Sequence, residues 1–500
     1  MLPGRRGPTD RARREVEGHL EELGDPEGSP ANPTGTLAVG AAEAPLPAPT
    51  GQASTREIWR LAWPVMLSQS LAALVNLADV AMVGRIGPEA QAAVGYAVQL
   101  FFVSQSALFA LSFACVAVMA RAIGAGQPDE ARRAFAASLV LCTAAATLLT
   151  AAMLAVPEPL LALISAEPAV IEICVPYLRY LMSSAVLLAI CLTIESGLRA
   201  DKDTRTPLRI TLVLAVVKLV LNALLIFGLA GLPALGVDGA GLATLIAQLV
   251  GVVLFVGAIR RRSAEGPLGV RSRDLRGMQR HMPELIRISV PGVAERLIMN
   301  VAMISYFAFI GGYGTVAAAT YTIGIRILSF SWIPGIGYSQ AVATLVGQSL
   351  GADDEEGARS AGWLAAKLAV ATAIAMGAVG ALAREPLAAV FTADPETVAT
   401  LGPFMLCLSL AQPVMQLHFT LAGAFRGAGD TWTPLVASVL GNWMFRVPLA
   451  WFAVVVLEGP LLWVWLVLIL DHLTRAVYLT WAYRRGTWLT RAPRQVHERP

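Results

Sequence analysis

Apolar runs of about 20 residues recur along this sequence from residue 57 to residue 483. Each run is long enough to cross the ~30 Å hydrocarbon core of a bilayer as an α-helix. Only 15% of the residues are charged and 56% are hydrophobic, whereas soluble domains carry about 25% charged and about 45–50% apolar residues. The sequence therefore predicts an integral membrane protein whose helices contact the lipid bilayer.

Turn residues and charges divide the apolar runs into twelve predicted helices. The connections are mostly short, so neighbouring helices are expected to run antiparallel. None of the connections is long enough to hold a soluble domain, and the predicted fold class is all-α. The predicted spans are 57–83, 93–122, 133–156, 170–197, 207–230, 238–259, 285–310, 317–347, 361–382, 397–424, 433–457 and 460–483.

A basic linker divides the chain into two halves. Residues 55–260 and 285–486 each hold six predicted helices, and residues 261–284 join them. Residues 1–54 are rich in Pro, Gly, Ala, Glu and Arg and lack an apolar run as long as a signal-peptide core. They are predicted to be a disordered cytoplasmic tail, and residues 487–500 a second tail.

Basic residues alternate between the loops, which predicts the orientation of the helices. Cytoplasmic loops of membrane proteins carry an excess of Lys and Arg. The predicted outer loops hold only Arg85 and Arg384. Both termini and the linker are therefore predicted to be cytoplasmic, in a multi-pass protein of the cell membrane. The other basic clusters are Arg5 to Arg60, Arg132 and Arg133, Arg199 to Arg209, Arg260 to Arg287, Arg359, Arg426, and Arg484 to Arg499.

Several classes of function lack a signal in the sequence. The formal net charge is +3, too small to imply a nucleic-acid partner. No GxxxxGK[ST] loop, HExxH or GxSxG motif is present, so neither an ATP-driven pump nor an enzyme is expected. We predict no metal site and no cofactor, because the five cysteines lie in apolar segments without CxxC spacing. They are Cys115, Cys142, Cys174, Cys191 and Cys407.

The two halves repeat one another at a single, constant displacement along the chain, the one that separates Gly124 from Gly351. IGAGQPDEAR (123–132) matches LGADDEEGAR (350–359), and LRADKDTRTPL (198–208) matches FRGAGDTWTPL (425–435). Because each half has an even number of helices, the repeats are parallel, related by an axis along the membrane normal. Two such lobes predict a secondary transporter with alternating access, and a duplicated scaffold is the alternative.

Several blocks resemble the multidrug and toxic compound extrusion (MATE) transporters. They are LAWPVMLSQSLAALVNLADVAMVGRIG (61–87), LVGQSLGADDEEGAR (345–359), DTRTP (203–207) and DTWTP (430–434). The resemblance implies two six-helix lobes around a V-shaped cavity, and efflux of amphipathic, often cationic small molecules in exchange for H⁺ or Na⁺. We expect a monomer. A flippase of lipid-linked precursors, from the same superfamily, is the alternative, and a channel or receptor is disfavoured because no polar ring is evident.

Asp79 is the leading candidate for ion coupling. A carboxylate at the centre of a membrane helix costs about 2.5–3.5 kcal/mol on insertion scales, so it indicates a functional site. Asp79 follows Pro64 by 15 residues, a rise of about 22 Å, and Asn76 lies one turn earlier on the same face. In the other interpretation, Asp79 is near enough to the outer end to be solvated.

The fifth predicted helix departs from the related transporters. Pro64 and Asp79 match the bent first helix and carboxylate of the MATE branch with an ion site in the N-terminal lobe. That branch carries Asn and, four residues on, Asp on the fifth helix, where this chain has Lys218 and Asn222. We hypothesise that Lys218 pairs with Asp79 and that H⁺ rather than Na⁺ drives transport, because an ammonium takes the place of a cation. Alternatively, Lys218 snorkels or pairs elsewhere.

Pro64 is a candidate hinge, because proline frees a helix carbonyl and makes bending cheap. A fixed structural kink is the other interpretation, since Pro291 occupies the same repeat position. In the second half, we predict that Glu295 forms a structural ion pair with Arg326 or Arg446, a direct coupling role being the alternative. Asp471, His472 and Arg475 are interpreted as a structural polar cluster, and His418 as a core residue. Arg296, Arg326 and Arg446 keep the flippase hypothesis open.

Overall fold

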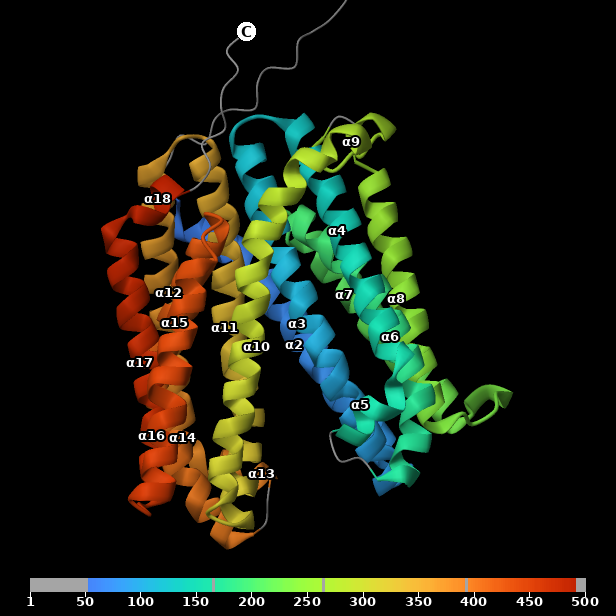
Figure 1. Ribbon diagram of the computed structural model, residues 1–500, viewed down its shortest axis with the longest axis vertical. Helices are drawn as coiled ribbons and strands as arrows, with labels where there is room; N and C mark the ends of the chain where they lie inside the picture. Colours follow the sequence, from blue (N-terminus) through green and yellow to red (C-terminus); the bar gives the residue numbers. More distant parts are fainter. Residues whose placement is uncertain (1–52, 164–166, 263–265, 392–393, 492–500) are drawn as a thin grey trace, which may run out of the picture. The chain divides into compact units, whose positions relative to one another are not determined.

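The computed structural model describes residues 53–491 apart from 164–166, 263–265 and 392–393 (Figure 1). The tail predicted over residues 1–54 lies almost entirely outside the described residues, as do residues 492–500. Pro47–Pro500 form one compact unit. Within its described residues the regular secondary structure is helical, which agrees with the predicted all-α fold class.

Six long helices lie before the linker and define the first bundle. They are α2 (Thr55–Gly84), α3 (Pro88–Gly124), α4 (Pro128–Ala155), α6 (Pro168–Ala200), α7 (Arg205–Phe227) and α8 (Gly236–Arg260). Two short helices, α5 (Pro157–Leu163) and η1 (Leu229–Gly231), connect them. The second bundle follows the linker helices α9 (Ser272–Gly277) and η2 (Met278–His281), and it begins at Met282 rather than at the predicted residue 285.

The second bundle is also built from six membrane-length segments. Five of them are single helices: α10 (Met282–Gly311), α11 (Thr315–Gly351), α12 (Glu355–Leu382), α14 (Pro395–Gly427) and α17 (Leu461–Arg485). The other segment, which precedes α17, consists of four consecutive short helices: α15 (Trp432–Val439), η3 (Leu440–Arg446), α16 (Val447–Trp451) and η4 (Phe452–Val456). Short helices α13 (Arg384–Phe391) and α18 (Thr487–Arg491) complete it. Over the described residues, 12 helices are long and apolar enough to cross a membrane, which agrees with the predicted number.

Local sequence signals fix where these helices begin and end. Ser54 and Asp394 cap α2 and α14, because each side chain accepts a hydrogen bond from a first-turn backbone N–H. Pro88 starts α3 at a position that needs no N–H donor. Gly228 and Gly486 end α7 and α17 in the left-handed conformation. The predicted final tail is in part structured, since Trp488 of α18 is fully buried.

The loops at residues 125–127, 201–204, 352–354 and 428–431 lie at the same end of the helices as α9, and we call this the linker end (Figure 1). Within the first bundle α6 packs on α3 and α8, and within the second bundle α14 packs on α11, α12 and α17. Between the bundles, α3 contacts α10 and α11, and α2 contacts α11. The helices of the two repeats therefore meet through equivalent elements.

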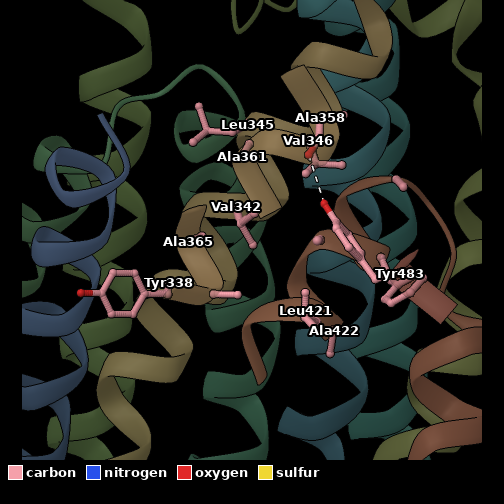
Figure 2. Packing of buried hydrophobic residues seen from close by; sticks show 14 of the residues in the cluster. Tyr338, Val342, Leu345, Val346, Ala358, Ala361, Ala365, Leu421, Ala422 and Tyr483 are labelled. Carbon is pink, nitrogen blue, oxygen red and sulfur yellow. Dashed lines mark hydrogen bonds between the residues drawn. The ribbon is translucent and has the colours of Figure 1, made fainter. Parts of the chain in front are cut away.

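The first helix of each repeat divides its packing between the two bundles. The linker-end part of α2 supplies Ile58 and Leu61 to a core cluster of the second bundle that includes Tyr338 and Tyr483 (Figure 2). Farther along, Val83 of α2 packs into the core of the first bundle. Helix α10 does the reverse: its Leu285 and Ile288 join the core of the first bundle, and its Tyr306 and Ile310 that of the second.

Candidate functional site

A pair of repeat-related glycines brings the bundles into backbone contact at the linker end. A Cβ atom on Gly124 of α3 would lie 2.0 Å from the carbonyl oxygen of Gln348 on α11. A Cβ atom on Gly351 would lie 2.0 Å from the carbonyl oxygen of Arg121 on α3. Gly124 and Gly351 are equivalent positions of the repeat, and so are Arg121 and Gln348. The two halves of the contact are therefore related by the same pseudo-two-fold symmetry as the two repeats.

Polar side chains at repeat-related positions, Arg121 and Gln348, close the same interface. Arg121 binds Glu284 of α10 at 2.7 Å and donates to the Ala428 carbonyl at 3.2 Å, while Gln348 donates to the Ala200 carbonyl at 2.7 Å. In addition, Arg199 of α6 donates to the Gln340 side chain of α11 at 2.7 Å. These contacts tie the first bundle to the second at the linker end.

A second arginine reaches across the interface at the position equivalent to Arg199. Arg426 of α14 lies with its guanidinium carbon 5.3 Å from the centre of the Phe113 ring on α3. Arg426 matches Arg199 in the repeat, and Gln340 matches Phe113 at the same displacement. Phe113, Arg199 and Gln340 all line a small cavity of about 10 Å³ between the bundles. Each bundle therefore inserts one arginine against the second long helix of the other.

Asp79 belongs to α2, and its carboxylate faces α7, where two donors contact it. The Lys218 ammonium binds Oδ2 and the Asn222 amide nitrogen donates to Oδ1. Asp79 and Lys218 keep 22% and 19% of their side-chain surface exposed, whereas Asn222 is buried. The predicted pairing of Lys218 with Asp79 is therefore present. Asn76, one turn earlier on α2, is exposed and makes no hydrogen bond to Asp79 in the described structure.

The contacts of Asp79 differ from those of a typical site for a metal cation. Each carboxylate oxygen of Asp79 faces an N–H donor, whereas hard cations are bound by several oxygen ligands. The Lys218 ammonium, which is hydrogen-bonded to the carboxylate, also repels a second cation. Among the described residues the Oδ1 atom of Asn222 is buried without a hydrogen-bond partner, so the amide retains an acceptor close to Asp79.

Pro64 is buried inside α2, near the end of the stretch that packs on the second bundle. Ile58 to Met66 pack in the second bundle, and Val83 packs in the first. Pro291 is equally buried between Ile288 and Tyr306 of α10. Both prolines thus lie in a helix that passes from one bundle to the other. A hinge role for Pro64 stays a prediction.

The predicted partners of Glu295 are wrong. Arg426 donates to both carboxylate oxygens of Glu295, at 2.7 and 3.0 Å, and Ser438 donates at 3.2 Å. The error arose because the sequence places Arg426 in a loop after a helix ending at 424. Helix α14 continues to Gly427 and buries Arg426 against α10. Arg326 of α11 is exposed instead.

Arg446 belongs to a different buried network. Its guanidinium lies 3.7 Å from Asp471 and 4.3 Å from the centre of the Tyr306 ring. Arg475 binds Asp471 at 2.7 Å and donates to the side-chain Oδ1 atom of Asn442 at 2.6 Å. The described contacts also include His418 and His472, whose ring nitrogens are 3.0 Å apart. The predicted polar cluster is thus larger than expected, and it surrounds the π-helical turn of η3, which no sequence pattern indicated.

Twelve membrane-length helices in two parallel repeats, with polar pairs buried between them, define a multi-pass membrane transporter. The MatE family model matches residues 64–224 and 291–452, one match in each repeat. The chain therefore belongs to the MatE family of membrane transport proteins, which are not enzymes.

Named relatives and solved structures agree with this family. Probable multidrug resistance proteins NorM are similar: that of Thermotoga maritima is 28% identical, covering 87% of this chain and 94% of the relative. That of Bradyrhizobium diazoefficiens is 30% identical, covering 79% and 85%. A Shewanella oneidensis FAD transporter is 26% identical, covering 77% and 87%. The crystal structure of a variant of the Vibrio cholerae MATE transporter VcmN shares the fold, with a TM-score of 0.81 and 21% identity, covering 86% and 96%.

Proposed function

We propose that this protein is a secondary multidrug efflux transporter that exchanges amphipathic organic compounds for protons. The observation that carries the choice of ion is the contact of Asp79 with the Lys218 ammonium and the Asn222 amide. The relatives named as multidrug resistance proteins support the substrate class. The proposal includes no cofactor, and the transporter is expected to act as a monomer.

Asp79 is the proton acceptor in this proposal. A proton on Asp79 removes the negative charge that holds Lys218, so the contact between α2 and α7 weakens. The acceptor oxygen of Asn222 that has no partner among the described residues can then accept the carboxyl hydrogen. Deprotonation restores the ion pair. Proton binding and release thus alternate between two arrangements of the same two helices.

Helix α2 transmits this change to the interface between the bundles. Its linker-end part packs in the second bundle, and Asp79 lies beyond Pro64 in the part that packs in the first. Bending at Pro64, which lacks an N–H donor, allows the two parts to move separately. We propose that this motion exchanges the closed linker end for an open one, by rocking of the two bundles.

The linker end faces the cytoplasm in this proposal, because the basic residues gather there. Arg121, Arg199 and the Gly124–Gly351 contact close that end. The structure then corresponds to a state closed to the cytoplasm. Transport of lipid-linked precursors is supported less, since Arg446 is engaged by Asp471 rather than left to bind a pyrophosphate.

The test is transport of the fluorescent cation ethidium into proteoliposomes with an imposed proton gradient or an imposed Na⁺ gradient. We expect the proton gradient alone to drive accumulation, and Asp79→Asn to abolish it. Glu158→Gln, which changes an exposed carboxylate of α5 in the same way, serves as the matched control and should transport normally. Accumulation that requires Na⁺ and ignores the proton gradient would overturn the proposal.

A further inference from the structure

The side of α10 that contacts α3 carries two polar side chains. One lies one helical turn beyond the contact at Gly292, and the other lies two turns beyond it. A Cβ atom on Gly292 of α10 would lie 3.3 Å from Cβ of Ala110 on α3, so the two helices approach closely there. Arg296 and Asn300 follow Gly292 at spacings of four residues and therefore lie on the same side of the helix. Both lie farther from the linker end than Gly292 does, because α10 begins at that end.

Arg296 is a cation in excess at this interface. Its neighbour Glu295 is already bound through both oxygens by Arg426. Arg296 is half-buried near the middle of α10 and makes no ion pair or hydrogen bond with the described residues, although its charge is felt by Glu295 and Arg426. An arginine without a partner at this depth is costly, and two arginines beside one glutamate leave a net positive charge.

Asn300 supplies an independent indication of a ligand. Its side-chain Nδ2 atom is buried and has no hydrogen-bond acceptor in the described part of the chain. A buried amide nitrogen without an acceptor is a destabilising feature, which a bound molecule or an ordered water can relieve. Arg296 and Asn300 both offer donors and no competing carboxylate, which is the complement of an anionic group.

The surroundings of these donors suit an aromatic or aliphatic body. Phe113 lies beside Arg426, and Phe109 lines the small cavity that Phe113 also lines. Farther from the linker end, Phe102 of α3 and Ile304 of α10 are 44% and 60% exposed. The donors of Arg296 and Asn300 lie nearer the linker end, and the apolar side chains lie farther from it. This order fits a molecule that has an acidic head group and an apolar body.

We infer that Arg296 and Asn300 bind the carboxylate or phosphate head of an amphipathic organic anion, which makes acidic compounds a substrate class of this transporter. The inference rests on the proposed function, because that function brings substrates between the bundles. It departs from the cationic substrates that the family resemblance implies. Arg296 sets the charge preference, and Asn300 orients the head group.

The test uses carboxyfluorescein as the anionic probe and ethidium as the cationic probe. Binding to the purified full-length protein is measured by fluorescence polarisation, and proton-driven transport is measured in proteoliposomes. Arg296→Gln is expected to weaken carboxyfluorescein binding by about tenfold or more, as the loss of a charge-assisted hydrogen bond does. Arg296→Lys retains the charge and is expected to bind within about threefold of wild type.

Ethidium binding distinguishes the lost charge from a damaged fold. It should be unchanged or tighter in Arg296→Gln, because a repulsive cation has been removed, and weakened ethidium binding there would instead mark a general defect and count against the inference. Carboxyfluorescein that fails to bind wild type, or that binds Arg296→Gln equally well, overturns the inference while proton-driven ethidium transport leaves the proposed function standing. Transport of neither probe under a proton gradient overturns the proposed function itself, whatever the binding result.

Discussion

Tyr306 occupies in the second repeat the position that Asp79 occupies in the first, and each receives a cation from the fifth long segment of its own bundle. Lys218 contacts the Asp79 carboxylate, whereas Arg446 lies 4.3 Å from the centre of the Tyr306 ring. A proton can neutralise the carboxylate, but it cannot remove the attraction of an aromatic face for a cation. The repeat therefore retains the cation at both positions, and of these two positions only Asp79 carries a charge that a proton can neutralise.

The Asp79–Lys218 pair should behave as a coupled unit in stability measurements. Asp79→Asn and Lys218→Gln each leave one charge without its partner, so each should lower stability by about 1–2 kcal/mol, less than for a fully buried pair. The double variant should lose less than the sum of the two, because neither charge remains. Thermal unfolding in detergent measures all three. Additive losses would show that the contact does not stabilise the fold.

The contact of Gly124 with Gly351 should be intolerant of a single methyl group. Gly124→Ala would place Cβ within 2.0 Å of the Gln348 carbonyl oxygen, forcing α3 and α11 apart at a cost of about 1–3 kcal/mol. Gly95→Ala is the matched control on α3, since a Cβ atom there meets nothing within 4 Å. The control should be neutral or up to about 1 kcal/mol more stable. Equal melting temperatures for both variants would contradict the close approach.

Glu295→Gln should destabilise the protein without altering proton coupling. It leaves Arg426 buried without its carboxylate, which costs about 3–5 kcal/mol for a buried pair. Glu385→Gln breaks an ion pair whose carboxylate is 75% exposed and should change stability by less than about 1 kcal/mol. The melting temperatures and the proton dependence of ethidium transport are compared in the same preparations. Normal stability combined with lost coupling would assign Glu295 the direct role that its position argues against.

The helices and the repeat were predictable because both depend on long stretches of sequence. The Asp79–Lys218 pair was predictable because Lys218 and Asn222 occupy the positions of the fifth helix at which the resembling MATE branch carries Asn and Asp beside the first-helix carboxylate. The partner of Glu295 was not, since moving the end of α14 from 424 to Gly427 converts Arg426 from a loop residue into a buried one. The sequence identified Arg296 as a charged residue inside a predicted helix. The face of α10 on which Arg296 lies depends on the rotation of α10 against α3, and only the Gly292 contact reveals that rotation.

The loop carboxylate Asp203 should make stability depend on pH at the linker end. Burial opposes its ionisation, but hydrogen bonds from Thr206 and the charge of Arg262 outweigh burial and lower the pKa of Asp203. A lowered pKa stabilises the fold above the unfolded value of about 3.9, and this contribution is lost as pH falls through the lower folded pKa. Asp203→Asn should therefore cost about 0.5–1 kcal/mol at pH 7 and nothing at pH values below the folded pKa.

Asp201 provides the contrasting control for that measurement. Burial raises the pKa of Asp201 despite the nearby Arg262, so its ionised form is disfavoured by folding. Asp201→Asn should leave stability at pH 7 unchanged or slightly higher. Melting temperatures of both variants between pH 3 and pH 7 separate the two cases, and a loss at pH 7 that is larger for Asp201→Asn would contradict the opposite signs.

Helices α2 and α10 each pack in the cores of both bundles. This shared packing has consequences for separating the two halves of the chain and for the origin of the repeat. A half-molecule ending in the linker would lack Leu285 and Ile288 from its core, and it would present Ile58 and Leu61 with no core to enter. Either half alone would therefore expose apolar side chains that the whole chain buries. The isologous contact of Gly124 with Gly351 is the kind found on the axis of a two-fold dimer, so the geometry is that of a homodimer in which each first helix packs on both subunits and the subunits are joined into one chain.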